Sequence, residues 1–309
     1  MKPLVSIIIP VYNGSNYLRE AIDSALAQTY DNVEILVIND GSMDGGKTEQ
    51  IALSYGDKIR YIAKDNGGSS SALNVGIRNM KGDFFSWLSH DDLYLPEKIE
   101  KQVECMGRLD VQNTIAACAG TLIDKNGEAM LGKPNRQQGL MSPRNALAIL
   151  SHGKGINGCG VLIPRFVLER VGFFDEKMVY LNDLDYWWRT ILQNVSVFFM
   201  RDELVKTRIH GSQVSVTKRE MFDWERHYLT NKLLDNVDGT PVDRYDALKQ
   251  IAYFCAAENL SEEYRRAMGK LAAAGHLSVG MRIYLCVAWI YGSVKRLLKW
   301  LRKKVLFSR

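Results

Sequence analysis

The first half of the chain repeats one pattern four times, and this repetition restricts the fold more than any other feature of the sequence. Each repeat is a short run of β-branched and other apolar residues, then a polar or glycine-rich turn, then a stretch with the apolar spacing of a helix. The apolar runs lie at 5–9, 35–38, 59–63 and 84–88. Strands that alternate with helices form a parallel sheet, so the pattern predicts an α/β fold.

Polar residues follow every one of these runs. The clusters lie at 11–14, 39–42, 65–71 and 89–92. Ligands of open parallel sheets bind outside the carboxyl ends of the strands, so we expect the four clusters to share one edge and to form one site. Asn, Asp, Gly and Ser also make ordinary turns and helix caps, and that alternative would explain any single cluster.

Asp91 and Asp92 are the most specific of these residues. The hydrophobic run before them predicts a buried strand that carries both carboxylates to the sheet edge. Two adjacent carboxylates repel each other unless a cation lies nearby, and oxygen ligands of this kind suit Mg²⁺ or Mn²⁺ that also bind phosphates. The pair therefore indicates a divalent cation site.

Two other clusters suit parts of a nucleotide. Asn66 and Gly68 precede a helix that also carries Asn74, and the N–H groups at a helix start favour an anion such as a diphosphate. Asp40 can accept a hydrogen bond from a base N–H or a ribose hydroxyl. Capping of the backbone at 42–45 is an equal alternative for its carboxylate.

A second acidic segment opens a helix predicted over 183–192. Asp183 can cap that helix or, at the rim of a cleft, remove a proton from an incoming hydroxyl. Asp185 and Arg189 stand four residues apart and are expected to pair on the helix surface. The two tryptophans at 187–188 fit a hydrophobic core better than a sugar platform.

The rest of the chain is less regular. Strands are expected at 115–123, 160–163, 195–200 and 204–209, a hairpin turn at 124–127, a loop at 132–142, and helices from about residue 220 to the end. The five cysteines are scattered and form no C-x-x-C. This distribution favours a reducing compartment over a disulfide framework or a zinc site.

Taken together, these segments resemble a family 2 glycosyltransferase with the GT-A fold. The resemblance rests on VSIIIPVYN (5–13), NDGS (39–42), SHDD (89–92), GFFDE (172–176) and NDLDYW (182–187). It covers about residues 4–215 and implies a mostly parallel sheet flanked by helices. We therefore expect a nucleotide-sugar-binding catalytic domain at 1–215 and a helical C-terminal region at 216–309.

The resemblance also implies a reaction and a role for each site residue. The enzyme would be inverting, would need Mn²⁺ or Mg²⁺, and would move a sugar from a nucleotide-diphosphate donor, most often UDP-linked, to a hydroxyl of a glycan or lipid-linked acceptor. A place in bacterial surface polysaccharide assembly is expected. The base and ribose would lie among Pro10, Val11, Tyr12, Asn13 and Asp40, with Asp91 near the ribose and metal, Asp92 and His210 at the metal, and Asp183 as the catalytic base. By itself, a lone His after a strand is more often exposed or hydrogen-bonded than a metal ligand.

The sequence departs from the family pattern at two positions. Two other function classes also remain as alternatives. The family often has D-x-D-D where this chain has SHDD, and Glu-Asp where it has Asn182-Asp183. A nucleotidyltransferase usually has a glycine-rich turn with basic residues after the first strand, which 11–14 lacks; this turn is also neither G-x-G-x-x-G nor a P-loop. A non-catalytic protein could bind lipid or nucleic acid through a basic tail.

The last 34 residues hold eight basic residues and no acid. Without this tail the chain has 32 basic and 35 acidic residues, so the overall charge of +5 belongs to the tail, and no nucleic-acid partner is expected for the body. The uncharged stretch 283–294 is shorter than the roughly 20 residues of a membrane-spanning helix.

On a helix, the apolar residues of this tail from Ile283 to Val305 would line one side, and the basic residues from Lys295 to Lys303 the other. That pattern predicts an in-plane helix on an anionic membrane surface. We therefore expect a cytoplasmic protein, peripheral to the inner face of the membrane. Docking of the helix on protein is the alternative.

Overall fold

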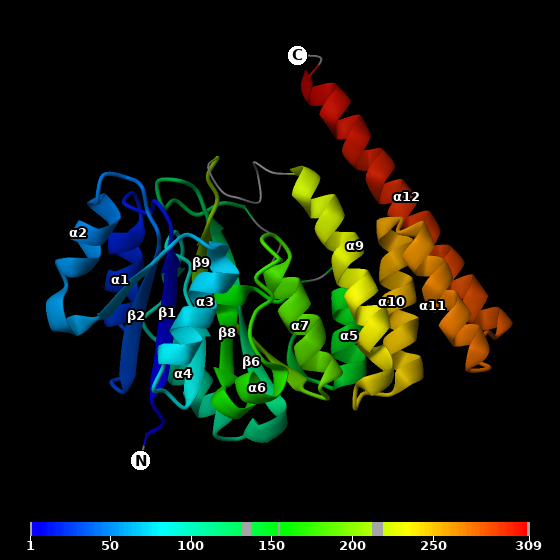
Figure 1. The fold of residues 1–309 in the computed structure, drawn as a ribbon, viewed down its shortest axis with the longest axis horizontal. Helices are drawn as coiled ribbons and strands as arrows, with labels where there is room; N and C mark the ends of the chain where they lie inside the picture. The colour runs from blue at the N-terminus through cyan, green and yellow to red at the C-terminus, as the bar shows by residue number, and fades with distance from the viewer. Residues whose placement is uncertain (1, 132–136, 154, 212–218, 308–309) are drawn as a thin grey trace.

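The computed structural model describes residues 2–131, 137–153, 155–211 and 219–307. Its centre is a nine-stranded mixed sheet in the order β3-β2-β1-β4-β8-β6-β9-β5, with β7 paired to β9. Figure 1 shows helices on both faces of this sheet. The strands are β1 (Val5–Val11), β2 (Val33–Asp40), β3 (Arg60–Lys64), β4 (Phe84–Trp87), β5 (Leu93–Tyr94), β6 (Thr114–Ile123), β7 (Gly139–Met141), β8 (Val161–Pro164) and β9 (Ser196–Arg208).

Helices connect the strands and then continue alone to the end of the chain. Those among the strands are α1 (Leu18–Leu26), α2 (Lys47–Leu53), α3 (Gly68–Asn79), α4 (Lys98–Met106), α5 (Pro143–Ser151), α6 (Arg165–Val171) and α7 (Asn182–Leu192). The C-terminal helices are α9 (Arg219–Asn236), α10 (Arg244–Glu258), α11 (Ser261–Ala273) and α12 (Val279–Phe307).

Alternate side chains of the central strands point to opposite faces and build two cores. Ile8 lies in the core that includes residues of α3, α5 and α7, whereas Ile7 and Ile9 lie in the core that includes residues of α1 and α4. Strands β1, β2, β3 and β4 pair in parallel, so all four end at the same edge of the sheet. The predicted α/β class with parallel βα units is confirmed.

Two details of the strand prediction are wrong. Segments 195–200 and 204–209 form one strand, β9, because its parallel pairing with β6 continues through a bulge. In this bulge Ala117 pairs with Phe199 and Ala119 with Glu203, so β9 holds extra residues there. Strand β7 lies within segment 132–142, which was expected to be a loop. Residues 132–136 of that segment are outside the described residues.

Helices α9 and α10 extend the core of the sheet. Leu229 of α9 and Phe254 of α10 are buried in the same core as Trp187 and Trp188, and the rings of Trp188 and Phe254 meet edge to face at 6.1 Å. The core position predicted for both tryptophans is confirmed. The boundary expected between two regions falls in 212–218, outside the described residues, and the helices beyond it share a core with the sheet.

Helix α12 packs on α10 with one face and leaves a second apolar face exposed. Met281, Leu285 and Ala288 are buried, and a Cβ on Gly292 would lie 2.1 Å from the carbonyl oxygen of Ala257 in α10. The exposed face carries large apolar side chains every three or four residues, namely Val279, Ile283, Val287, Ile290 and Val294. The start of α12 therefore docks on protein, while the apolar stripe expected from the sequence faces solvent.

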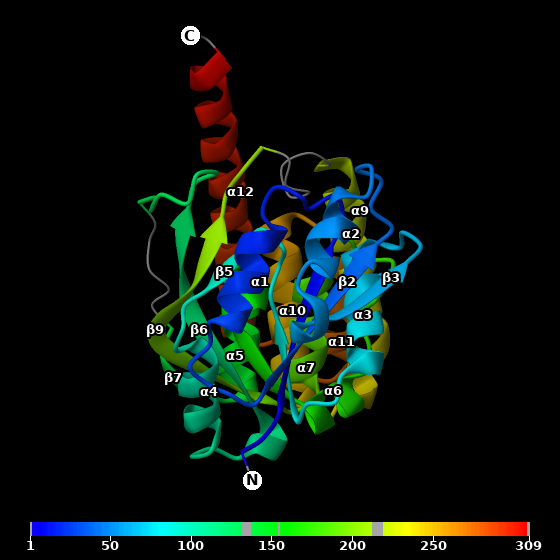
Figure 2. The same ribbon diagram turned by 90° about the vertical axis from the view of Figure 1, so that its left-hand side faces the viewer.

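The far end of α12 extends beyond the sheet edge at which the parallel strands end, as both views show (Figures 1 and 2). Among the residues described, none of the helices is both long enough and apolar enough to span a bilayer.

Candidate active site

Asp91 and Asp92 follow the end of β4, as predicted. Asp92 is buried, and its Oδ1 accepts a hydrogen bond of 2.9 Å from the backbone N–H of Arg208. Burial, and then the charge of Asp91, raise the pKa of Asp92 to about 7. Two full negative charges are therefore unfavourable here, and a cation beside the pair would relieve their repulsion.

The end of β9 brings Arg208 and His210 to this acidic pair. The Nε2 atom of His210 lies 3.0 Å from Oδ2 of Asp91. Arg208 is almost fully buried; its Nε donates to the carbonyl oxygen of Asp91 at 3.0 Å, and its Nη2 lies 2.7 Å from a carboxylate oxygen of Glu20 in α1. The ring of Tyr17 lies 4.2 Å from the Arg208 guanidinium carbon and 5.2 Å from the His210 ring.

Arg208 is a site residue that the sequence analysis missed. A signal was present, because side chains two residues apart on a strand share one face, and His210 had already been placed at the end of this strand. The arginine binds both the backbone and the side chains around the acidic pair, so it fixes Asp91 and Asp92 against the end of β9.

The end of β1 lies beside the end of β2. Pro10 and Val11 are buried within the strand, whereas Tyr12 and Asn13 are exposed. Asn13 has a left-handed backbone with φ of 50°, and its N–H donates to the hydroxyl of Ser42 at 2.9 Å. Of the four predicted residues in this turn, Tyr12 and Asn13 are therefore the two whose side chains are accessible to a ligand.

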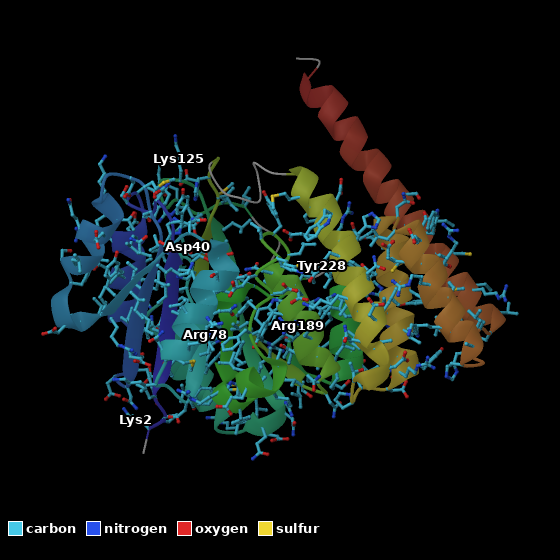
Figure 3. The ribbon with its side chains drawn as sticks, in the orientation of Figure 1. Lys2, Asp40, Arg78, Lys125, Arg189 and Tyr228 are labelled. Atoms are coloured by element: carbon cyan, nitrogen blue, oxygen red, sulfur yellow. The ribbon has the colours of Figure 1, made fainter. Side chains whose placement is uncertain are left out.

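Asp40 organises the glycine turn instead of capping the backbone that follows it. Its Oδ1 lies 2.6 Å from Lys64 Nζ and 3.0 Å from the Gly67 nitrogen, and its Oδ2 accepts a 2.7 Å bond from the Gly68 N–H. The side-chain amide of Asn66 donates to the Asp40 carbonyl oxygen at 2.9 Å. Two of the N–H groups expected to face a diphosphate, those of Gly67 and Gly68, are thus bound to Asp40. Figure 3 shows Asp40 toward the strand-end edge and Lys2 at the opposite edge.

Asn74 requires a correction. It is buried, and its amide nitrogen donates to the Phe174 carbonyl and to a Glu176 carboxylate oxygen, both at 2.9 Å. Its amide oxygen accepts the N–H of Phe174, also at 2.9 Å. Both side-chain N–H groups and the oxygen are therefore used inside the protein, so we assign Asn74 a structural role, holding residues 174–176 against α3, in place of the expected donor contact.

Asp183 is the second residue of α7. Its side chain is partly exposed, its Oδ1 accepts a 2.6 Å bond from the N–H of Leu184, and burial raises its pKa to about 6. The amide of Asn182 donates to the Ser69 hydroxyl at 3.2 Å, which places the start of α7 beside the start of α3. A carboxylate with this pKa is ionised at neutral pH and is suited to accept a proton.

Asp185 does not form the surface pair expected from the sequence. It is completely buried, with its Oδ2 2.8 Å from Nε of Arg189 and its Oδ1 2.9 Å from Nζ of Lys232 in α9. The pairing with Arg189 is present, but helix α9 covers this side of α7. In Figure 3 the labels of Arg189 and Tyr228 mark the two facing helices.

The residues at the end of β4 suit a divalent cation. A cation there would meet the carboxylates of Asp91 and Asp92, with Nε2 of His210 3.0 Å from Oδ2 of Asp91, and it would offset the burial and the charge of Asp91 that raise the pKa of Asp92. In the described part of the chain, no three His, Cys, Asp or Glu side chains are grouped closely enough to hold a metal. A cation here would therefore take further ligands from water or from a diphosphate, as Mg²⁺ commonly does.

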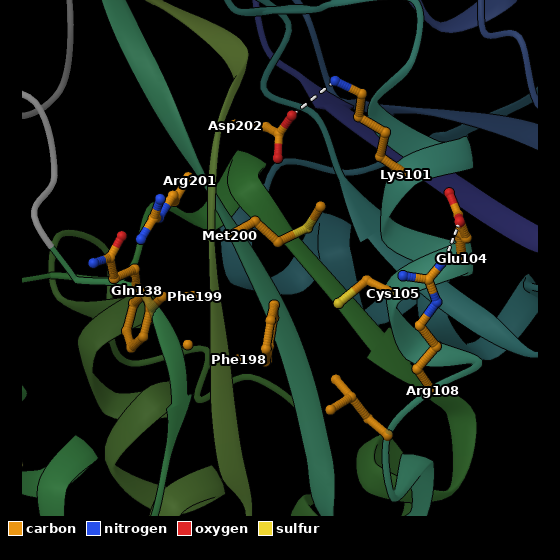
Figure 4. A pocket seen from close by; sticks show the side chains of 12 residues that line it. Lys101, Glu104, Cys105, Arg108, Gln138, Phe198, Phe199, Met200, Arg201 and Asp202 are labelled. Atoms are coloured by element: carbon orange, nitrogen blue, oxygen red, sulfur yellow. Dashed lines mark hydrogen bonds and ion pairs between the residues drawn. The ribbon is translucent and has the colours of Figure 1, made fainter.

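A hollow of about 690 Å³ opens elsewhere, between α4, β7 and the first half of β9 (Figure 4). Apolar side chains of Phe198 and Met200 line it, together with the ion pair of Lys101 and Asp202, whose charged atoms are 2.7 Å apart. None of the predicted site residues lines this hollow. Its size alone does not make it the active site, because the chemically suited side chains lie at the strand-end edge.

Comparison with known proteins identifies the family. The profile described as "Glycosyl transferase family 2" matches residues 6–172, which is more than half of the chain. The chain belongs to glycosyl transferase family 2. The matched segment of this glycosyltransferase includes Asp40, Asp91 and Asp92 and ends before Asp183 and His210.

Relatives and solved structures agree with this assignment. The glycosyltransferase is 41% identical to a glycosyltransferase of Rickettsia prowazekii (strain Madrid E) over 97% of each chain. It is 25% identical to the Escherichia coli enzyme named UDP-Glc:alpha-D-GlcNAc-diphosphoundecaprenol beta-1,3-glucosyltransferase, over 73% of this chain and 84% of that one. Staphylococcus aureus TarS 1–349 with UDP-GlcNAc superimposes with a TM-score of 0.67 and 15% identity, over 96% and 91% of the two chains, which confirms the predicted GT-A fold.

Proposed function

We propose that this glycosyltransferase is an inverting enzyme that transfers a sugar from a UDP-linked donor to a hydroxyl of a lipid-linked or membrane-displayed glycan, in the assembly of a bacterial surface polysaccharide. The observation that carries the proposal is an acidic pair at the end of β4 together with a third carboxylate at the start of α7, which lies beside the start of α3. Asp91 and Asp92 lie at the end of β4, and Asp183, with its raised pKa, lies at the start of α7.

The names of two similar proteins support the proposed substrates. The Escherichia coli relative is named for UDP-Glc as donor and for a GlcNAc-diphosphoundecaprenol, a lipid-linked sugar, as acceptor. TarS, which shares the fold at low identity, has been crystallised with UDP-GlcNAc. UDP and a lipid-linked acceptor are therefore the first substrates to test.

The chemistry needs a base on one side of the sugar and a site for the diphosphate on the other. Asp183 takes the proton of the acceptor hydroxyl while that oxygen forms a bond to the anomeric carbon. The bond from the anomeric carbon to the diphosphate breaks, and the nucleoside diphosphate leaves with the electron pair. Because this is a single displacement from the opposite face, the configuration of the anomeric carbon inverts.

The donor would lie across the ends of β1 and β4. Tyr12, exposed at the end of β1, would contact the base, and the group formed by Asp91, Asp92 and His210 would lie toward the diphosphate. Mn²⁺ or Mg²⁺, held by Asp91 and Asp92 with His210 close by, would offset the charge of the departing diphosphate. Arg208 holds the acidic pair in place through its hydrogen bonds to Asp91 and Asp92.

Calorimetry with UDP tests the donor site. UDP should bind in the presence of Mn²⁺, and the affinity should collapse when EDTA is added or in Asp92→Ala. Because ionised Asp92 is the form that attracts a cation and its pKa is about 7, affinity should rise as pH increases through about 7 and then level off. Equal affinity with Mn²⁺, with EDTA and in Asp92→Ala would refute the cation site.

We also propose that α12 attaches the enzyme to an anionic membrane. Its apolar face at Val279, Ile283, Val287, Ile290 and Val294 is exposed although the opposite face is buried on α10. The sequence after this face is rich in Lys and Arg and has no acid, which suits anionic headgroups. The end of α12 also projects on the side of the sheet where the candidate active site lies (Figure 1), so a membrane bound there would face the acceptor side of the enzyme.

A further inference from the structure

A buried carboxylate in the C-terminal helices holds the segment that leads to Asp183. Glu225 of α9 is completely buried. Its Oε1 accepts the N–H groups of Val179 at 2.8 Å and Tyr180 at 3.2 Å, and its Oε2 accepts those of Tyr180 at 2.9 Å and Leu181 at 2.8 Å. Three consecutive peptide groups therefore point at one side chain that is 44 to 46 residues away in the sequence.

This contact comes from another helix and holds the residues that lead into α7. The N-cap residue of α7 is Leu181, which has no side-chain oxygen and makes no capping bond. The first N–H groups of a helix need acceptors, and the positive end of the helix dipole favours a negative charge. Glu225 places a negative charge at this end of α7 and accepts the N–H groups of residues 179–181, which lie just before the helix. Within the helix, Oδ1 of Asn182 accepts the N–H of Asp183, and Oδ1 of Asp183 accepts that of Leu184.

Other contacts fix the same segment, which we call the base loop (residues 173–181). Lys232, two turns after Glu225 in α9, lies 2.6 Å from a carboxylate oxygen of Asp175 in the base loop and 2.9 Å from one of Asp185 in α7. On the opposite side, the hydroxyl of Ser70 in α3 donates to the carbonyl oxygen of Met178 at 2.8 Å. The base loop is thus held between α3 and α9, and the contact that reaches closest to Asp183 on the α9 side is that of Glu225.

We propose that Glu225 is a positioning residue for the transfer reaction, which acts by holding the start of α7 so that Asp183 faces the acceptor hydroxyl. The inference rests on the proposed function, because it takes Asp183 as the base. It assigns part of the catalytic arrangement to α9, beyond the segment that matches the family profile. The donor contacts proposed above involve the ends of β1, β4 and β9 and not α9, so Glu225 should affect the rate of transfer and leave donor binding intact.

The test is Glu225→Gln in the full chain, because glutamine has nearly the same volume but presents an NH₂ group to peptide N–H groups that need an acceptor. At saturating donor and acceptor, kcat should fall roughly 10- to 100-fold, the loss expected when a catalytic group shifts by about 1 Å. UDP affinity should be unchanged. A loosened α7 start exposes Asp183 to water, so the acidic limb of the kcat–pH profile should move to lower pH, toward the ordinary pKa of a carboxyl.

The matched control is Glu258→Gln. Glu258 of α10 pairs with Arg226, the neighbour of Glu225 on α9, with charged atoms 2.5 Å apart, and it is not seen to contact the base loop. This variant removes one acid beside the same helix, so a general weakening of α9 would appear in both variants. Glu258→Gln should keep the kcat and the pH profile of the unsubstituted enzyme.

Three results decide the matter. A folded Glu225→Gln variant with the kcat and pH profile of Glu258→Gln would overturn the proposal. If Glu225→Gln does not fold, amide hydrogen exchange of the unsubstituted protein replaces it: the amides of 179–181 should exchange as slowly as those in the middle of α7, and fast exchange would overturn the proposal. Absence of sugar transfer by the unsubstituted enzyme would instead refute the proposed function, whatever the exchange result.

Discussion

At the scale of single residues, the proposed role of Asp183 as base makes its ionisation the step that should set the pH dependence of transfer. Burial raises its pKa to about 6, although the N–H of Leu184 stabilises the charge. A general base must be ionised, so kcat should rise as pH increases through about 6 and should level off above it. Substituting Asp183→Asn should lower kcat by about 10²–10⁴-fold, the usual contribution of a general base, and leave UDP affinity unchanged.

Steady-state kinetics over a range of pH with saturating donor measure both effects. Asp202→Asn is the control, because Asp202 is a solvent-accessible carboxylate paired with Lys101 and is not among the predicted site residues. A profile that is flat through pH 6, or an Asp183→Asn variant as active as the Asp202→Asn control, would show that another group removes the proton.

The sequence alone could predict the positions of site residues that directly follow a strand. Asp91, Asp92 and His210 lie together because β4 and β9 end at one edge. It was insufficient where the partner is distant in the chain and gives no local pattern. Asn74 is bound by Phe174, 100 residues away, and Asp185 by Lys232, 47 residues away. Both had to be reassigned once those partners were seen.

At the scale of elements, α12 has two apolar faces, one that packs on protein and one that is exposed. Met281, Leu285 and Ala288 pack inward, and Gly292 permits the close approach to Ala257. A chain that ends after Ser293 keeps these contacts. It should therefore fold with a normal melting temperature and bind UDP with Mn²⁺, but should no longer sediment with anionic liposomes, because the basic residues from Lys295 onward are removed.

Liposome sedimentation at low and high salt, with a melting curve for each chain, is the measurement. A chain that ends at Ser278 is the comparison: it also loses the buried face of α12, so its melting temperature should fall. The full chain should bind anionic liposomes most strongly at low salt, since salt screens the attraction of Lys and Arg to the headgroups. Membrane attachment by this tail would be contradicted if the full-length protein does not sediment with anionic liposomes, or if a chain ending at Ser293 still does.

Most elements could be predicted from the spacing of apolar residues, and those that could not depend on pairing. The βα units at 5–106 follow from alternation alone. The continuity of β9 could not be predicted, because the charged residues at 201–203 interrupt its apolar pattern and are accommodated by a bulge against β6. Docking of α12 on protein was the stated alternative, but the sequence could not show which face docks, since nothing local distinguishes the buried face from the exposed stripe.

At the scale of the whole molecule, the candidate active site and the proposed membrane contact lie on the same side. The parallel strands end at one edge, Asp40 and the acidic pair lie along it, and the end of α12 extends past it in both views (Figures 1 and 2). Because α9 and α10 share the core of the sheet, α12 is joined to the catalytic region through packed helices. A lipid-linked acceptor would therefore approach Asp183 from the side to which the membrane binds.

The most direct test of this account is the product formed from a nucleotide sugar. The full chain is incubated with UDP-sugars, Mn²⁺ and anionic liposomes that contain a polyprenyl-diphosphate-linked sugar, and the released nucleotide is quantified. The account predicts release of UDP that requires both the cation and the acceptor, with a lipid-linked product of inverted anomeric configuration. Release of pyrophosphate in place of UDP, or a product that retains the configuration of the donor, would contradict it.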